Sequence, residues 1–318
     1  MKRTLMATAV ALACLGPVAQ NANAGTATTV HPIVLVHGIF GFNNFYGAPY
    51  FYGISDTLTS NGATVYTATV AAAGSNETRG YQLWQYLKQI RNARNNQSLK
   101  FNLIGHSQGS PTARWVAQYD PGMVASVTSV DGVNKGSRVA DIVRRAAPAG
   151  TYTEAVIGTV ANAFTAMYVL ATGNSSMPQS TIDALNSLTT AGLTAFNSRN
   201  PGGVPSGCGE GAYSANIRGY NVKYYSWGGA KQLTNVLDPF DAGIGVLSLA
   251  FVGSGEANDG LVSTCSQRLG KVIRADYKMN HLDAVNGWFG FVAPSWVEPT
   301  NPKTVYLTHA NRLKNAGL

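Results

Sequence analysis

The pentapeptide Gly105-His106-Ser107-Gln108-Gly109 constrains the fold of this chain most strongly. The apolar residues 101–104 before it predict a buried strand, and residues 108–119 after it predict a helix. Glycines stand two residues before and two residues after Ser107, and a glycine lets the backbone turn where a side chain would clash. We therefore expect an abrupt strand–turn–helix junction that presents Ser107.

The rest of the chain repeats the alternation between strand and helix. Apolar, β-branched or alternating runs predict strands at residues 33–36, 63–70, 124–130, 222–227 and 271–277. Helical spacing of apolar residues predicts helices at residues 53–60 and 77–93. Strands that alternate with helices through short connections favour a parallel sheet with helices on both faces. The expected fold class is α/β.

Ser107 stands in the Gly-x-Ser-x-Gly pattern of the nucleophile elbow of α/β hydrolases, with a strand before it and a helix after it. A serine hydroxyl is a weak nucleophile until a histidine takes its proton. In this fold the chain order is serine, acid, histidine, and only His281 and His309 follow Ser107. His309 belongs to an amphipathic terminal helix, where histidines mostly pack or face solvent. We favour His281, which follows a predicted strand, as the base.

A carboxylate must orient that histidine. The residues alone leave five acids open, and Asp259 is favoured because it lies in a tight polar turn before an apolar pair. The oxyanion hole is expected from the backbone N–H groups of Gln108, which follows the nucleophile, and of Ile39, which follows an early strand. The acids that precede His281 are Asp238, Asp241, Glu256, Asp259 and Asp276.

The first 24 residues have the pattern of a secretory signal peptide. Lys2 and Arg3 are followed by a short apolar run and by Ala22-Asn23-Ala24, a small-residue cleavage site. A membrane anchor or a lipid anchor at Cys14 are the alternatives, but the run is short and contains Gly16 and Pro17. We expect secretion through the periplasm, with one catalytic domain at residues 25–318.

Export leaves two cysteines, Cys208 and Cys265, in the mature chain. In an oxidising compartment an isolated pair most simply forms one disulfide, and two buried free thiols are the alternative. The formal charge of +8 becomes +6 without Lys2 and Arg3. The basic residues form no stripe with interleaved aromatics, so nucleic-acid binding is not expected.

The middle of the chain breaks the strand–helix rhythm. No charged residue lies between Glu154 and Asp183. Residues 155–171 carry apolar side chains at helical spacing, which predicts either a helix buried in the core or a mobile lid over an active site.

With these residues in place, the chain resembles the secreted true lipases of the Pseudomonas and Burkholderia type. The match extends over nearly all of the mature sequence. The motifs that carry it are Val36-His37-Gly38-Ile39-Phe40-Gly41-Phe42, Asn102-Leu103-Ile104 with the pentapeptide, Cys208-Gly209-Glu210-Gly211-Ala212-Tyr213, Asn258-Asp259-Gly260-Leu261-Val262, Met279-Asn280-His281-Leu282-Asp283 and His309-Ala310-Asn311-Arg312-Leu313-Lys314.

The resemblance implies an α/β-hydrolase fold and a triacylglycerol lipase that uses Ser107, Asp259 and His281. It implies that Cys208 pairs with Cys265 and that a lid lies near residues 155–171. It also implies one structural Ca²⁺, which takes six to eight oxygen ligands. The ligands would be the carboxylates of Asp238 and Asp283 and the carbonyls of Gly287 and Phe291.

The implied partners are a lipid ester at an oil–water interface and a membrane-anchored foldase during folding, and we expect a monomer. Two alternatives keep the same triad: a broader carboxylesterase or polyester hydrolase, and an acyltransferase. A lipid-binding protein without activity is the alternative from another class, and the intact set of serine, acid and histidine disfavours it.

Overall fold

The computed structural model describes residues 25–39, 41, 49–145, 153, 155–156, 159, 180–238, 240–287, 289–293 and 300–318. The predicted signal peptide, residues 1–24, lies outside the described residues. So does most of the predicted lid, residues 155–171. In the described part of the chain, no helix combines the length and the apolar character that crossing a bilayer requires.

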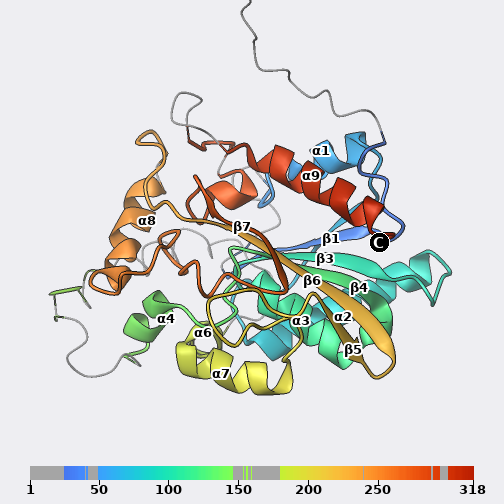
Figure 1. The fold of residues 1–318 in the computed structure, drawn as a ribbon, viewed down its shortest axis with the longest axis horizontal. Coiled ribbons are helices and arrows are strands. Elements are labelled where there is room, and N and C mark those ends of the chain that lie inside the picture. Colours follow the sequence, from blue (N-terminus) through green and yellow to red (C-terminus); the bar gives the residue numbers. More distant parts are fainter. Residues whose placement is uncertain are drawn as a thin grey trace, which may run out of the picture.

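A mostly parallel sheet forms the centre of the molecule (Figure 1). Its strands follow the order β2-β1-β3-β4-β6-β5, and β7 also pairs with β6. Among the described strands, β5 alone runs antiparallel, as a hairpin partner of β6. The strands are β1 (Ile33–Val36), β2 (Val65–Ala68), β3 (Phe101–His106), β4 (Val124–Val130), β5 (Ser214–Ile217), β6 (Tyr220–Gly229) and β7 (Lys271–Tyr277). Parallel strands end at one edge of the sheet, where such folds place their ligands.

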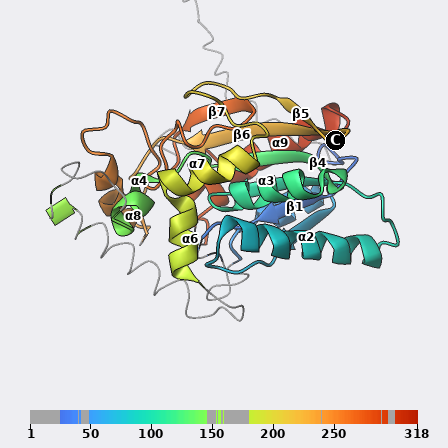
Figure 2. The ribbon, with the colours of Figure 1, turned by 90° about the horizontal axis from the view of Figure 1, so that it is seen from below.

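Helices cover both faces of this sheet (Figures 1 and 2). On one face lie α2 (Asn76–Ala93) and α3 (Gly109–Tyr119), and on the other lie α1 (Ile54–Ser60) and α9 (Pro302–Asn315). Strand β1 explains why: Val34 and Val36 pack into the α2–α3 core, and the alternate residues, Ile33 and Leu35, pack into the α1–α9 core. Burial of each such side chain stabilises the fold by roughly 1.5–3 kcal/mol.

Four further helices of the described residues lie beyond the carboxyl ends of the strands. They share a third core with the loop residues Val133 and Val262. They are α4 (Arg138–Val143), α6 (Thr181–Leu188), α7 (Thr190–Arg199) and α8 (Asp241–Leu247), and 3₁₀ turns lie at Pro121–Met123, Ser248–Phe251 and Asp283–Val285. The sequence patterns predicted none of these four helices.

The predicted α/β class is confirmed, and no boundary of a predicted strand or helix moves by more than two residues. The strand predicted at residues 63–70 is shorter, and the strand predicted at residues 101–104 extends to His106. Helix α2 begins one residue early because the Ser75 hydroxyl accepts from the N–H of Thr78 and caps it.

A disulfide joins Cys208 to Cys265, as predicted. It ties the loop before β5 to the loop before β7, across 57 residues of sequence.

Candidate active site

Ser107 lies on the turn between β3 and α3 with a left-handed backbone, φ +55°. The two glycines of the motif make this turn possible. A Cβ on Gly105 would lie 2.2 Å from the carbonyl oxygen of Gly109, and a Cβ on Gly109 would lie 2.1 Å from that of Val36. The turn is held in place by the Ser107 N–H, which donates to the carbonyl of Val130 on the neighbouring strand at 2.9 Å. A non-glycine residue in this conformation is strained and marks a candidate functional site.

His281 and Asp259 form a buried hydrogen-bonded pair. The imidazole Nδ1 lies 2.7 Å from Oδ2 of Asp259, and both side chains are almost completely buried. The carboxylate is held by three more donors: the N–H groups of Leu261 and Val262, at 2.9 and 2.7 Å, and the Gln267 amide, at 2.9 Å. Because Asp259 accepts from Nδ1, the Nε2 of His281 is the nitrogen left to accept a proton.

The other acids that the sequence left open have different partners among the described residues. Asp276 is mostly exposed beside Arg274. The remaining carboxylates accept from Phe240 (Asp238), from Thr234, Asn235 and Asn280 (Asp241) and from Arg138 (Glu256).

His309, the other candidate base, is fully buried on α9 and has its Nε2 2.8 Å from the hydroxyl of Thr128. It packs between Tyr225 and Trp227, the packing role expected for it.

His106 connects the base to the nucleophile turn. Its ring lies 4.6 Å from the ring of His281, centroid to centroid, and its Nε2 lies 2.9 Å from the backbone carbonyl of His281. Its Nδ1 lies 2.6 Å from the hydroxyl of Tyr50, and that hydroxyl accepts from the N–H of Gly38 at 3.2 Å.

These contacts fix the proton positions. A carbonyl only accepts, so His106 carries its proton on Nε2 and accepts at Nδ1 from the Tyr50 O–H. The Tyr50 oxygen then accepts from Gly38. Burial keeps the pKa of His106 well below its ordinary value, so the ring is neutral as this arrangement requires. One chain of hydrogen bonds therefore joins the loop after β1, the residue before Ser107 and the backbone of His281.

The expected oxyanion donors lie on rigid supports. A Cβ on Gly38 would lie 2.7 Å from Cβ of Ser107, so the loop that carries Ile39 lies directly against the nucleophile. The Gln108 amide donates to the carbonyl of Gly74 and to Asn76, at 2.8 and 3.1 Å, which fixes the backbone of Gln108. Within the described residues, neither the Ile39 N–H nor the Gln108 N–H donates to a protein acceptor.

Comparisons with known proteins agree with this geometry. The family model of the alpha/beta hydrolase fold matches residues 31–202. A triacylglycerol lipase of Vibrio cholerae is 49% identical over 92% of this chain and 91% of the relative, and one of Pseudomonas fragi is 41% identical over 91% and 98%. The chain belongs to the bacterial lipases of the α/β-hydrolase family. A crystal structure of Bacillus licheniformis lipase BlEst2 aligns with 81% of this lipase-family chain and 87% of its own, at 19% identity and a TM-score of 0.55, and thus shares its fold.

Sequence patterns did not single out Arg79 of this lipase-family chain. The side chain is fully buried, and its guanidinium donates to the backbone carbonyls of His37 (2.5 Å) and Ala71 and to the hydroxyl of Thr112 (3.3 Å). Burial lowers the pKa of Arg79 to about 9. Its contact with His37 holds the first residue of the loop that carries Ile39, here called the oxyanion loop. The signal that could have indicated Arg79 is its position on the inner face of an amphipathic helix, because an arginine there needs buried acceptors.

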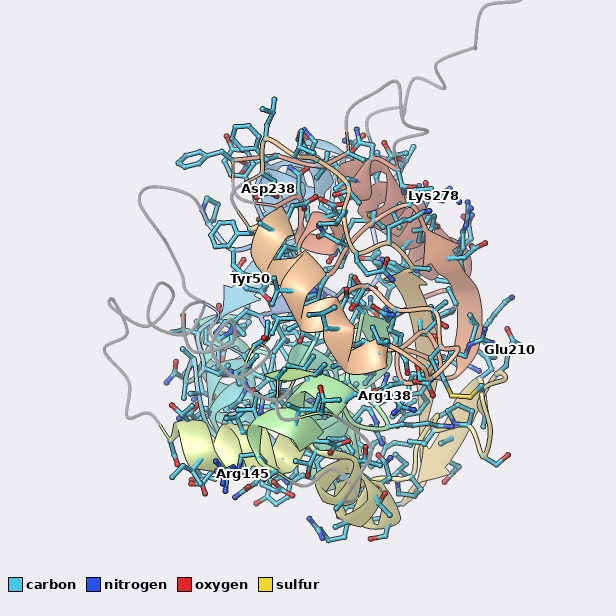
Figure 3. The ribbon with its side chains drawn as sticks, turned by 90° about the vertical axis from the view of Figure 1, so that its left-hand side faces the viewer. Tyr50, Arg138, Arg145, Glu210, Asp238 and Lys278 are labelled. Carbon is cyan, nitrogen blue, oxygen red and sulfur yellow. A yellow bond between two sulfur atoms is a disulfide. The ribbon has the colours of Figure 1, made fainter. Side chains whose placement is uncertain are left out.

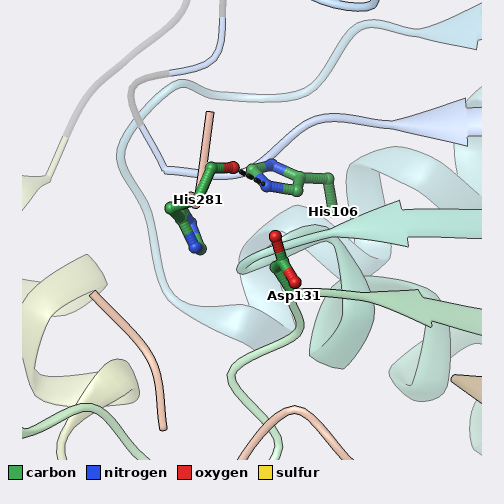
Figure 4. Close-up of side chains that lie close together, drawn as sticks. All are labelled: His106, Asp131 and His281. Atoms are coloured by element: carbon green, nitrogen blue, oxygen red, sulfur yellow. Dashed lines mark hydrogen bonds between the residues drawn. The ribbon is translucent and has the colours of Figure 1, made fainter. Parts of the chain in front are cut away.

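Asp131 is the second residue that sequence reasoning missed. It follows β4 directly and lies fully buried, with a carboxylate oxygen, a ring nitrogen of His106 and a ring nitrogen of His281 within 4.8 Å of one another (Figure 4). Two histidines and a carboxylate can hold a metal ion. Here both nitrogens of His106 and Nδ1 of His281 are already hydrogen-bonded, so the cluster suits proton positioning better than metal binding.

The residues expected around calcium lie beyond the carboxyl edge, and Figure 3, which faces this end, labels Asp238 beside α8. Burial, together with nearby carboxylates, raises the pKa of Asp238 to about 6 and that of Asp283 to about 7. Oδ1 of Asp283 is buried and has no partner among the described residues. The carbonyl oxygen of Phe291 lies against Gly287, 2.4 Å from where a Cβ would be.

Proposed function

We propose that this chain is a secreted triacylglycerol lipase that works through an acyl-enzyme on Ser107. The observation that carries the proposal is the buried His281–Asp259 pair beside a left-handed serine turn. An imidazole that donates to a carboxylate has the tautomer and orientation of a general base. The likeness to curated triacylglycerol lipases supports the choice of substrate.

In the proposed reaction, Oγ of Ser107 attacks the ester carbonyl carbon while its proton passes to Nε2 of His281. The carbonyl oxygen becomes negatively charged and accepts hydrogen bonds from the N–H groups of Ile39 and Gln108, while Asp259 stabilises the imidazolium. The bond to the glycerol oxygen then breaks, and that oxygen takes the proton from Nε2. Water, deprotonated by His281, then attacks the acyl carbon. The bond from that carbon to Oγ of Ser107 breaks, the fatty acid leaves, and Oγ takes the proton back from Nε2, which restores the free enzyme. Each oxyanion donor contributes roughly 3–4 kcal/mol.

Replacement of Ser107 tests the function. We expect Ser107→Ala to lower the hydrolysis of an emulsified triacylglycerol by about 10⁴-fold or more, because the acyl-enzyme cannot form. Ser198→Ala, which removes a surface hydroxyl from α7, is the matched control and should keep full activity. Fatty acid release near the wild-type rate by Ser107→Ala would disprove the proposal, whereas transfer of the acyl group to added alcohol in preference to water would favour an acyltransferase.

We also propose one structural Ca²⁺ bound by the carboxylates of Asp238 and Asp283 and the carbonyls of Gly287 and Phe291. The raised pKa values of the two aspartates and the unpartnered oxygen of Asp283 fit a cation at this place. When bound, the ion supplies positive charge that holds the segment two residues beyond His281.

Chelation tests the calcium site. A chelator should lower the melting temperature of the wild type, because an ion that binds only the folded state stabilises it. The Asp283→Asn variant should melt lower from the start and respond less to chelator. An unchanged wild-type melting temperature with excess chelator would rule out the site.

We further propose export with cleavage after Ala24, a lid near residues 155–171, a foldase that assists folding, and a monomeric product. The composition of residues 1–24 and the Cys208–Cys265 disulfide support an oxidising compartment. N-terminal sequencing of the secreted enzyme tests the cleavage site, and its mass in solution tests the monomer. A rise in activity as the substrate passes its solubility limit tests the lid. The yield of active enzyme with and without a co-expressed foldase tests the role of the foldase.

A further inference from the structure

Asp131 occupies a position from which it can act on the catalytic histidine. It is the first residue after β4, the strand beside β3, so it stands at the same edge of the sheet as Ser107. Its carboxylate lies within 4.8 Å of a ring nitrogen of His281 and a ring nitrogen of His106 (Figure 4). A shift of roughly 2 Å at most would bring it to hydrogen-bond distance from the His281 ring.

The carboxylate of Asp131 is only half satisfied. Oδ1 accepts from the N–H of Gly229 at 2.6 Å, but Oδ2 is buried and has no partner in the described part of the chain. A buried polar oxygen without a partner costs free energy and calls for an explanation. Acceptance from Gly229 alone does not provide one, since an asparagine oxygen would serve equally well.

Asp131 and Asp259 oppose each other's charge. Burial raises the pKa of Asp131 well above its ordinary value, and the charge of Asp259 raises it further. Both effects favour the neutral form of the Asp131 carboxyl group. Removal of the Asp259 carboxylate removes that opposition, and a neighbouring imidazolium then favours the ionised form of Asp131.

We propose that Asp131 is a second, reserve carboxylate for His281, which takes over the hydrogen bond to the imidazole when Asp259 is absent or displaced. It acts as a positioning residue, because it contacts substrate only through His281. The inference rests on the proposed function of Ser107 and His281, and it adds a redundant acid from a different strand end.

A double-mutant cycle tests the reserve role. Asp259→Ser removes the first carboxylate but keeps a hydroxyl that can accept from Leu261 and Val262. We expect it to lower kcat for a soluble short-chain ester by about 10–100-fold, less than the roughly 10⁴-fold loss known for triads without their acid. Asp131→Asn keeps the acceptor for Gly229. In the Asp259→Ser background, Asp131→Asn should lower kcat by a factor at least ten times larger than the factor by which it lowers kcat in the wild type.

Asp276→Asn in the same background is the matched control, because it removes an exposed carboxylate on β7 and makes the same change in net charge. It should leave the activity of Asp259→Ser unchanged. Melting temperatures of all variants separate loss of fold from loss of chemistry, and Asp259→Ala replaces Asp259→Ser if the latter does not fold.

If Asp131→Asn lowered kcat by the same factor with and without Asp259, the inference would be overturned, because a merely structural residue gives additive losses. That result leaves the proposed function intact. Failure of the proposed function has another signature, which is an active Ser107→Ala variant.

Discussion

Single buried hydrogen bonds set the geometry around Ser107. Arg79 holds the carbonyl of His37, and Tyr50 links the N–H of Gly38 to His106. None of these contacts can be recognised from local pattern, because each joins residues that are far apart in the sequence. The sequence motif predicted the nucleophile and the order of the triad. The residues alone favoured Asp259 among five acids, and the resemblance strengthened that choice. The positioning residues appear only in three dimensions.

The Tyr50→Phe variant tests the chain of hydrogen bonds at this scale. Loss of the hydroxyl leaves Gly38 and His106 without their buried partner, at a cost of about 1 kcal/mol or more. We expect kcat for a soluble ester to fall about tenfold with little change in KM, because the oxyanion loop and His281 lose a common support. Tyr213→Phe, which removes a hydroxyl that pairs with Tyr225 away from the site, is the control. Equal kcat values for the two variants would contradict this role.

At the scale of elements, strands were predicted well and the helices of the middle region were not. β1 and β4 have the predicted bounds, because apolar runs buried on both faces leave a clear pattern. β7 also has the predicted bounds, although its residues are exposed or only half-buried. α6 is only eight residues long, and α7, which packs into a core with loop residues such as Val133 and Val262, has an apolar pattern with little helical regularity. The edge strand β5 was missed because it has only four residues, too few to show a clear alternation.

The closeness of β1 to the start of α3 gives an element-scale prediction. Gly109→Ala should destabilise the fold by about 2–4 kcal/mol and nearly abolish activity, because its Cβ would meet the carbonyl of Val36 at 2.1 Å and force the elbow away from β1. Gly207→Ala adds the same methyl group in open space and should change neither property. Denaturant unfolding and ester hydrolysis measure both. Similar stabilities for the two variants would show that the junction tolerates separation.

At the scale of the molecule, several histidines are buried in neutral form. Burial lowers the pKa of His37 from 6.5 to about 3 and that of His309 well below 6.5. As pH falls below 6.5, the unfolded chain binds protons that the folded chain excludes, so the stability falls until about pH 3 is reached for His37. Above pH 6.5 these histidines are neutral in both the folded and the unfolded chain, so they add no pH dependence to the stability.

His309→Gln isolates one such histidine. Glutamine can still bond to Thr128, and the groups that face the site, Tyr225 on β6 and Arg312 on α9, stay unchanged. We expect the free energy of unfolding of the variant to fall less steeply between pH 6.5 and 4 than that of the wild type, by up to roughly 1.4 kcal/mol per pH unit. If the free energies of unfolding of the variant and the wild type, measured by urea titration, fell equally with pH, His309 would make no contribution to acid sensitivity.

The proposed mechanism requires that the molecule bring its base, His281, from far along the chain to a serine on the turn after an inner strand. Reaction with a phosphonate ester, followed by peptide mass mapping, tests it most directly. We expect one stoichiometric adduct on Ser107, formed rapidly by the wild type and at least a thousandfold more slowly by His281→Ala. An adduct on another residue, or equal rates for the two proteins, would contradict it.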